Sequence, residues 1–146
     1  MISYVDTSAL VKLMVDEVGS EEMRSLWEEG LPTAGSAIGY SELCCALAAV
    51  VRSGRLPAAA ADEVLDLADD IWKRVFTIAA DKALARHAGA LGVRHGLRAL
   101  DAVHVATALT LAEAELTMVS WDRGLRRAAT AEGLSVYPET TTAVST

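Results

Sequence analysis

The chain has 146 residues, of which 52% are hydrophobic and only 5% aromatic, and its formal net charge is −7. This length and composition fit one domain with an aliphatic core, which we place at residues 1–138, with a flexible tail at 139–146. The acidic total argues against a strongly basic nucleic-acid-binding protein, because phosphate binding depends on cations. A locally basic face is still compatible with the sequence, since residues 71–146 contain nine bases and seven acids.

The two cysteines and the opening segment indicate where the protein works. Cys44 and Cys45 are adjacent in a helical pattern, where a disulfide between them is geometrically poor, so they are typical of a reduced, cytoplasmic protein. The three histidines do not have the spacing of zinc ligands. Asp6 and Lys12 interrupt the opening apolar segment, which also has no basic leader, so we expect neither a signal peptide nor a membrane span.

Residues 2–5 are rich in β-branched and aromatic side chains and predict a strand, after which the apolar spacing becomes that of a helix. Asp6 stands at the carboxyl end of this strand, where open α/β sheets build their sites. Thr7 and Ser8 are available as caps for the helix. The alternative to a functional role for Asp6 is that it only caps this helix.

The rest of the chain predicts alternating elements. We expect helices at 20–27, 37–52, 58–68, 81–94, 97–109 and from 123 toward Gly133, and strands at 31–34, 74–78, 116–121 and 134–137. Alternation with short connections is typical of a parallel sheet covered by helices on both faces. We therefore predict an α/β fold in the form of a three-layer α/β/α sandwich.

Three more acids fall where this topology would bring them to the edge that carries Asp6. Glu42 lies among small apolar residues of helix 37–52, although an ordinary surface glutamate is the alternative. Asp101 lies in the first turn of a helix that we expect to be buried nearly all round, and an unpaired buried carboxylate costs several kcal/mol. Asp122 directly follows the fourth strand, as Asp6 follows the first.

Four carboxylates at one mouth repel one another unless a cation lies between them. Oxygen ligands without thiolates or histidines select Mg²⁺ or Mn²⁺. Such an ion binds phosphate oxygens and activates water for attack on a phosphodiester. His104, one turn beyond Asp101, is more typical of a hydrogen-bonded core histidine than of a ligand.

The chain resembles the PIN-domain ribonucleases, and in particular the VapC-type toxins of toxin–antitoxin pairs. The resemblance covers essentially the whole length and rests on four motifs: Val5–Leu10, Ser36 with Glu42, Leu100–Ala106, and Ser120-Trp121-Asp122. It implies a central five-stranded parallel sheet, homodimers, and a cognate VapB-like antitoxin with a segment over the active site. It also implies that the metal site is formed by four acids: Asp6, Glu42, Asp101 and Asp122. Ser120 stands where the family usually has threonine.

We therefore predict an endoribonuclease dependent on Mg²⁺ or Mn²⁺, acting as the toxin of a toxin–antitoxin pair. The hydroxyls of Thr7, Ser8 and Ser120 are expected to orient the carboxylates. The substrate should be single-stranded or looped RNA, because RNA specificity usually targets unpaired bases. A non-catalytic PIN-like module that binds RNA or protein, and a PIN nuclease that matures RNA or cleaves DNA, are the alternatives. A phosphatase of the haloacid dehalogenase type is disfavoured, since Ser8 stands where that class needs a second acid.

Four arginines are candidates for contacts with RNA phosphates. Arg98 and Arg123 are the stronger candidates. For the other two, Arg126 and Arg127, an ordinary solvated helix surface is favoured.

Overall fold

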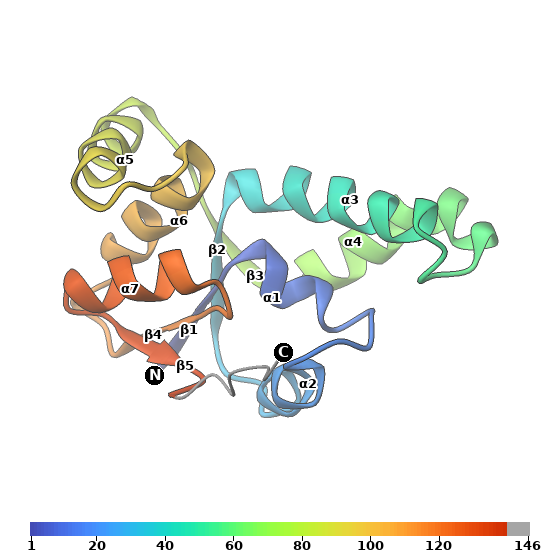
Figure 1. Ribbon diagram of the computed structural model, residues 1–146. Helices are drawn as coiled ribbons and strands as arrows, with labels where there is room; N and C mark the ends of the chain where they lie inside the picture. The colour runs from blue at the N-terminus through green and yellow to red at the C-terminus, as the bar shows by residue number, and fades with distance from the viewer. Residues whose placement is uncertain (140–146) are drawn as a thin grey trace, which may run out of the picture.

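The computed structural model describes residues 1–139, so the tail expected at 139–146 falls outside the described residues except for its first position. Five strands are present in this part of the chain: β1 Ile2–Val5, β2 Thr33–Ser36, β3 Val75–Ile78, β4 Leu116–Val119 and β5 Ser135–Tyr137. All pair in parallel, in the order β3-β2-β1-β4-β5 (Figure 1). The predicted five-stranded parallel sheet is confirmed, with β1 at its centre.

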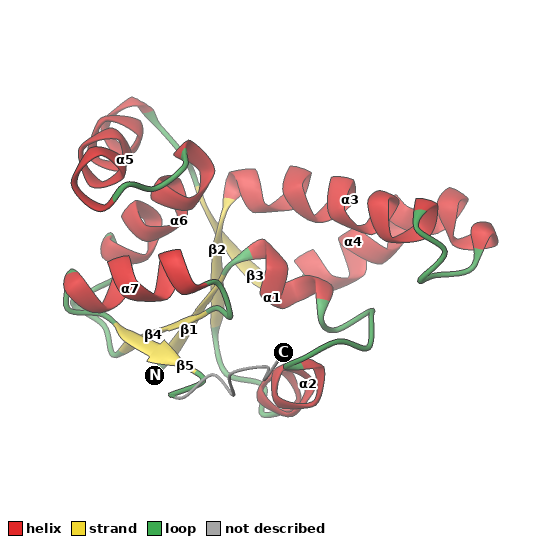
Figure 2. Ribbon diagram, viewed as in Figure 1, coloured by secondary structure: helices red, strands yellow, loops and turns green. Residues whose placement is uncertain are grey.

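Helices cover both faces of the sheet (Figure 2). Their bounds are α1 Thr7–Val11, α2 Ser20–Glu28, α3 Ala37–Arg52, α4 Val64–Trp72, α5 Lys82–His95, α6 Ala99–Leu109 and α7 Arg123–Ala131, with a 3₁₀ segment, η1, at Ala58–Glu63. Because strand side chains alternate between faces, Tyr4 and Met118 pack under α5, α6 and α7, whereas Val5 and Val119 pack under α1 to α4. The predicted three-layer α/β/α sandwich is therefore confirmed.

Several element boundaries differ from the predicted ones for local reasons. β2 begins at Thr33 and not at residue 31, since Pro32 has no N–H to contribute to a parallel ladder. The helix expected at 58–68 is divided, because no residue of η1 is buried and regular α-helix starts only with the buried Val64. β4 ends at Val119, so Ser120 and Trp121 lie in the loop before α7.

α6 is less enclosed than its composition predicted. Leu100 is 50% exposed, while Val105, Ala106 and Ala108 are fully buried. The first turn of α6 projects beyond the core at the carboxyl edge of the sheet, whereas the later turns pack against the core. The expectation that α6 is buried nearly all round is therefore wrong for its first turn.

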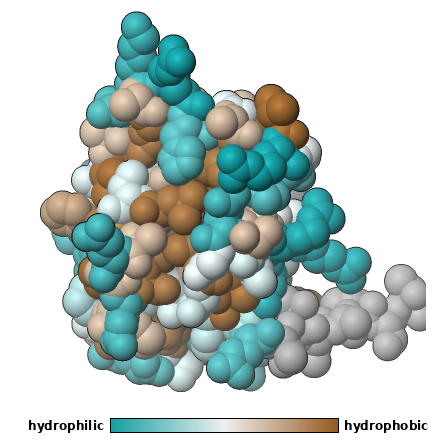
Figure 3. Space-filling model, turned by 90° about the vertical axis from the view of Figure 1, so that its left-hand side faces the viewer, coloured by the Kyte–Doolittle hydropathy of each residue, from teal (hydrophilic) through white to brown (hydrophobic). Residues whose placement is uncertain are grey.

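The outer face seen in Figure 3 has apolar side chains interspersed with polar ones. Among the large apolar residues of α5 and α6, Val93 is 90% exposed and Leu100 is half exposed. None of the helices described in residues 1–139 combines the length and the apolar character that crossing a membrane requires.

Candidate active site

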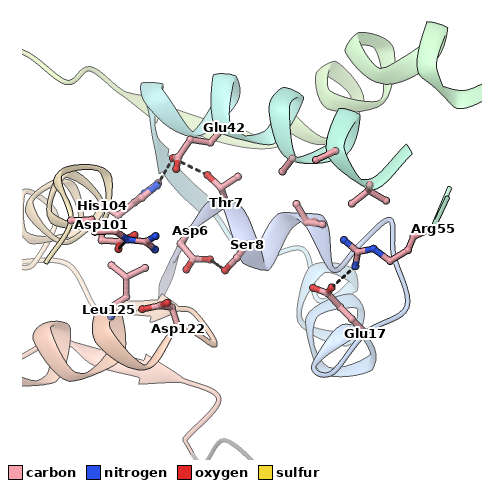
Figure 4. A pocket seen from close by; sticks show the side chains of 15 residues that line it. Asp6, Thr7, Ser8, Glu17, Glu42, Arg55, Asp101, His104, Asp122 and Leu125 are labelled. Atoms are coloured by element: carbon pink, nitrogen blue, oxygen red, sulfur yellow. Dashed lines mark hydrogen bonds and ion pairs between the residues drawn. The ribbon is translucent and has the colours of Figure 1, made fainter. Parts of the chain in front are cut away.

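A pocket of about 450 Å³ opens at the edge of the sheet where β1 and β4 end. Its lining includes all four acids that the sequence singled out: Asp6, Glu42, Asp101 and Asp122 (Figure 4). They come from the end of β1, the second turn of α3, the first turn of α6 and the start of α7. Parallel strands and the helices that follow them bring these distant parts of the chain to one mouth.

Asp6 is the most buried of the four, at 2% exposure. Its Oδ1 accepts the Ala9 N–H (2.8 Å) and the Ser8 hydroxyl (2.9 Å), and its Oδ2 accepts the Ser120 hydroxyl (2.6 Å). The bond from Ala9 makes Asp6 the N-cap of α1, so capping and a place in the pocket coincide in one residue. Loss of solvation raises the pKa of Asp6, and the bonds from Ser120, Ala9 and Ser8 oppose that rise only in part.

Glu42 is held by two side chains. Its Oε1 accepts the Thr7 hydroxyl (3.0 Å) and lies 2.7 Å from Nε2 of His104. Nδ1 of the same imidazole lies 2.8 Å from the hydroxyl of Tyr4, whose pKa is raised by burial. Desolvation opposes the charge of Glu42, but the hydrogen bonds from His104 and Thr7 favour it, and the pKa of Glu42 is lowered.

His104 is therefore a buried, hydrogen-bonded histidine, at 2% exposure, and it also orients a site carboxylate. In the neutral tautomer with the proton on Nε2, the imidazole donates to Glu42 and accepts from Tyr4. The sequence favoured a hydrogen-bonded core histidine but gave no indication of these two partners.

Asp101 and Asp122 are less buried than Asp6. The Arg98 Nε–H donates to Asp101 Oδ2 (3.2 Å), and the Arg98 side chain is itself 86% exposed. Asp122 Oδ1 accepts the Leu125 N–H (2.8 Å) and so caps α7, while the Asp122 N–H donates to the Ser120 hydroxyl (3.1 Å). Ser120 therefore links two of the four acids, Asp6 and Asp122.

The remaining candidate arginines lie outside the pocket lining. Arg123 and Arg127 are exposed on α7. Arg126 does not match the solvated surface predicted for it, since its guanidinium donates to the backbone carbonyls of Ser120 (2.9 Å) and Pro138. Arg126 thus ties the loop that carries Ser120 to the segment after β5.

The donor set suits a hard divalent cation, although the side chains are not gathered into a ligand shell. Within residues 1–139, no three His, Cys, Asp or Glu residues are close enough together to hold an ion. One oxygen each of Glu42, Asp101 and Asp122 has no protein partner in this described part of the chain, and all three residues face the pocket. Carboxylate oxygens are the ligands that Mg²⁺ and Mn²⁺ prefer, so these residues fit such an ion.

The pocket also has a second polar end, which our sequence reasoning missed. Glu17 and Arg55 line it on the side opposite the four acids (Figure 4). They are 38 residues apart and belong to loops, so no periodicity could connect them. A charged residue in the apolar run of the first helix was the one available signal: Lys12, which is 8% exposed, donates to Glu17 Oε1 (2.9 Å).

Comparison with known proteins connects this arrangement to one family. The model of the PIN domain family matches residues 3–131. Ribonuclease VapC49 of Mycobacterium tuberculosis is 35% identical over 135 residues, which are 92% of this chain and 94% of that protein. Among solved structures, FitAcB from Neisseria gonorrhoeae has a TM-score of 0.64 at 23% identity, covering 95% of this chain and 98% of that one. A toxin–antitoxin complex from Klebsiella pneumoniae has a TM-score of 0.59 at 17% identity, covering 82% and 86%.

Proposed function

Because the chain belongs to the PIN-domain family, as its motifs predicted, we propose that it is a metal-dependent endoribonuclease acting as the toxin of a toxin–antitoxin pair. Support comes from a relative named as a ribonuclease that is similar over almost the whole of both chains. The observation that carries the proposal is the presence of Asp6, Glu42, Asp101 and Asp122 in the lining of one pocket.

In this proposal the four carboxylates hold Mg²⁺ or Mn²⁺. A bound divalent ion of this kind neutralises charge on phosphate oxygens and lowers the pKa of water so that it can attack phosphorus. The chain itself supplies a negative, oxygen-lined mouth. A carboxylate with an unpartnered oxygen, such as Asp101 or Asp122, can accept the proton of the attacking water.

Other side chains hold these groups in place or contact RNA. Ser120 and Ser8 fix the carboxylate of Asp6, and Thr7 and His104 fix that of Glu42. Arg98 stands on the rim with its guanidinium largely exposed, where it can bind a phosphate oxygen of the substrate. Arg123, exposed in the first turn of α7, can contact a phosphate farther along the strand.

We propose further that the protein is a homodimer and that a VapB-like antitoxin covers the pocket in the cytoplasm. One structural neighbour is titled a toxin–antitoxin complex, and Val93 and Leu100 are apolar side chains that an interface could cover. Cys44 and Cys45 are free thiols, which suits a reducing compartment. Light scattering of the purified chain tests the dimer, and a monomeric mass would count against it.

Cleavage of a mixed RNA pool tests the proposed activity. Purified protein is assayed with Mg²⁺, with EDTA, and as Asp6→Asn, with Asp62→Asn as the matched control on the exposed 3₁₀ segment. We expect cleavage only with Mg²⁺, by the wild type and by the Asp62 variant. Cleavage that persists in EDTA and in Asp6→Asn would refute the mechanism. A folded protein inactive in every condition would favour a module that only binds RNA or protein.

A further inference from the structure

The candidate active-site pocket continues beyond the four carboxylates along α1 and α3. Its middle section is lined by small apolar side chains: Val11, Ala46, Ala49 and Val50. Ala49 lies seven residues after Glu42 on α3, which at 1.5 Å per residue is about 10 Å along the helix axis. The far end of the pocket is therefore separated from the carboxylates by an aliphatic floor and ends at Glu17 and Arg55 (Figure 4).

Glu17 and Arg55 form an ion pair that is anchored from both sides. Arg55 Nη1 lies 3.3 Å from Glu17 Oε2, and Arg55 Nε–H donates to the Ser53 hydroxyl (3.3 Å). Glu17 Oε1 lies 2.9 Å from Nζ of Lys12, which also donates to the Val18 carbonyl (2.8 Å). The buried lysine fixes the carboxylate, and the carboxylate in turn orients the guanidinium.

The pair still has unused hydrogen-bonding capacity on the pocket side. A guanidinium has five N–H donors, of which two have partners in the described part of the chain. The Glu17 carboxylate has about four acceptor positions and accepts two bonds. The side chain of Arg55 is 52% exposed and that of Glu17 is 31% exposed, so adjacent donors and acceptors are accessible to a ligand.

This combination suits a nucleobase better than a phosphate. The aliphatic floor beside Arg55 offers a phosphate no further donor, and the adjoining Glu17 carboxylate offers it only acceptors. A base has a flat apolar face for such a floor and an edge for the ion pair. Guanine presents the acceptors O6 and N7, which arginine binds bidentately, and N1–H and N2–H donors that a carboxylate accepts.

We propose that this far end is a base-binding subsite that selects a guanine in the RNA substrate, with Arg55 as the donor to O6 and N7 and Glu17 as the acceptor of the N1 and N2 protons. The proposal rests on the proposed function, since it assigns the subsite to a nucleotide near the bond that the carboxylates cleave. It adds a sequence preference to an active site whose carboxylates are proposed to act on the sugar–phosphate backbone of the RNA.

Binding of short RNAs in EDTA tests the subsite separately from cleavage. Fluorescence anisotropy is measured with oligouridine hexamers that carry one central guanine, adenine, inosine or 7-deazaguanine. The protein variants are Arg55→Ala and Arg55→Lys, with Arg52→Ala as the matched control, because Arg52 is exposed on the last turn of α3 and does not line the pocket. Lysine keeps the charge but loses the planar fork, so it separates bidentate recognition from simple attraction.

We expect the wild type to bind the guanine hexamer about 10-fold or more tightly than the adenine hexamer, as one bidentate base contact allows. Both Arg55 variants should lose this preference and Arg52→Ala should keep it. Inosine lacks the N2 amine and 7-deazaguanine lacks N7, so each should bind more weakly than guanine. Equal weakening of all hexamers by Arg55→Ala, with recovery in Arg55→Lys, would identify a phosphate contact and overturn the proposal.

Unchanged RNA binding in Arg55→Ala would also overturn the proposed guanine subsite. The ion pair of Glu17 and Arg55 would then be assigned to binding a protein. The two proposals fail separately. Guanine-selective binding without Mg²⁺-dependent cleavage would retain the subsite and reject the nuclease. Cleavage at sites without a guanine preference, mapped by sequencing the products, would retain the nuclease and reject the subsite.

Discussion

Replacing Ser120 with alanine removes one hydroxyl that bonds both the carboxylate of Asp6 and the backbone N–H of Asp122. The hydroxyl donates to Asp6 Oδ2 at 2.6 Å and accepts the Asp122 N–H at 3.1 Å, and Ser120 is fully buried. In Ser120→Ala, Asp6 Oδ2 would lose its one protein partner among the described residues.

The expected loss of stability follows from these two bonds. A hydrogen bond to a charged group contributes about 1.5–3 kcal/mol and a neutral one about 0.5–1.5 kcal/mol, so we expect unfolding to become easier by about 2–4 kcal/mol. In a chain of this size that lowers the melting temperature by about 5–15 °C. Since the Ser120 bond is the strongest influence that lowers the pKa of Asp6, its loss should also move the acidic limit of RNA cleavage to higher pH.

Thermal unfolding by circular dichroism, at pH 8 with EDTA, measures the first effect. Ser120→Thr keeps the hydroxyl and should retain most of the stability, and Ser135→Ala, exposed on β5, should be nearly neutral. A pH profile of cleavage measures the second effect. A melting temperature within about 2 °C of wild type, which is below 1 kcal/mol for this size, would refute the role given to this hydroxyl.

Three other changes test neighbouring parts of the argument. Asp6→Asn should abolish cleavage yet raise the melting temperature in EDTA, because it removes the charge that burial disfavours. The pKa of Asp6 is raised in the folded state, so the wild type loses stability as pH rises above the pKa that Asp6 has in the unfolded chain. The difference in melting temperature between Asp6→Asn and the wild type should therefore grow with pH, and a difference that stays constant would contradict this reasoning. Arg126→Gln should cost about 1–3 kcal/mol in urea unfolding by releasing the Ser120 carbonyl, and an unchanged midpoint would show that this tie is dispensable. Gly19→Ala should reduce stability by more than about 1 kcal/mol, because φ is +89° and the new Cβ would lie within 2.4 Å of Trp121, and wild-type stability would disprove that contact.

The strongest local signals were the ones that predicted elements well. β1 and α3 have the predicted bounds because a β-branched run ends at a charged residue in one and a capping serine precedes a long apolar helix in the other. Where a boundary depends on tertiary packing, as at η1, the sequence alone could not locate it. The convergence of the four acids on one pocket was likewise accessible, because parallel strands end at one edge of the sheet and the helices that follow them begin there.

The remainder of the site depends on contacts that no spacing encodes. His104 faces Glu42 across 62 residues, and Arg55 faces Glu17 across 38. Each contact joins two elements whose distance is set by how the helices pack on the sheet. A lysine in an apolar segment and a histidine in an aliphatic helix were visible as anomalies, but their partners were not.

The bonds from Tyr4 through His104 to Glu42 run from one helical layer to the other, past the edge of the central strand. The His104 imidazole therefore connects the two helical layers, whose apolar cores lie on opposite faces of the sheet. A small shift of α6 over the sheet would move His104 and, through its hydrogen bond, the carboxylate of Glu42 on α3. Substitutions in the core under α5 and α6, at residues that do not line the pocket, can thus shift the Glu42 carboxylate without unfolding the protein.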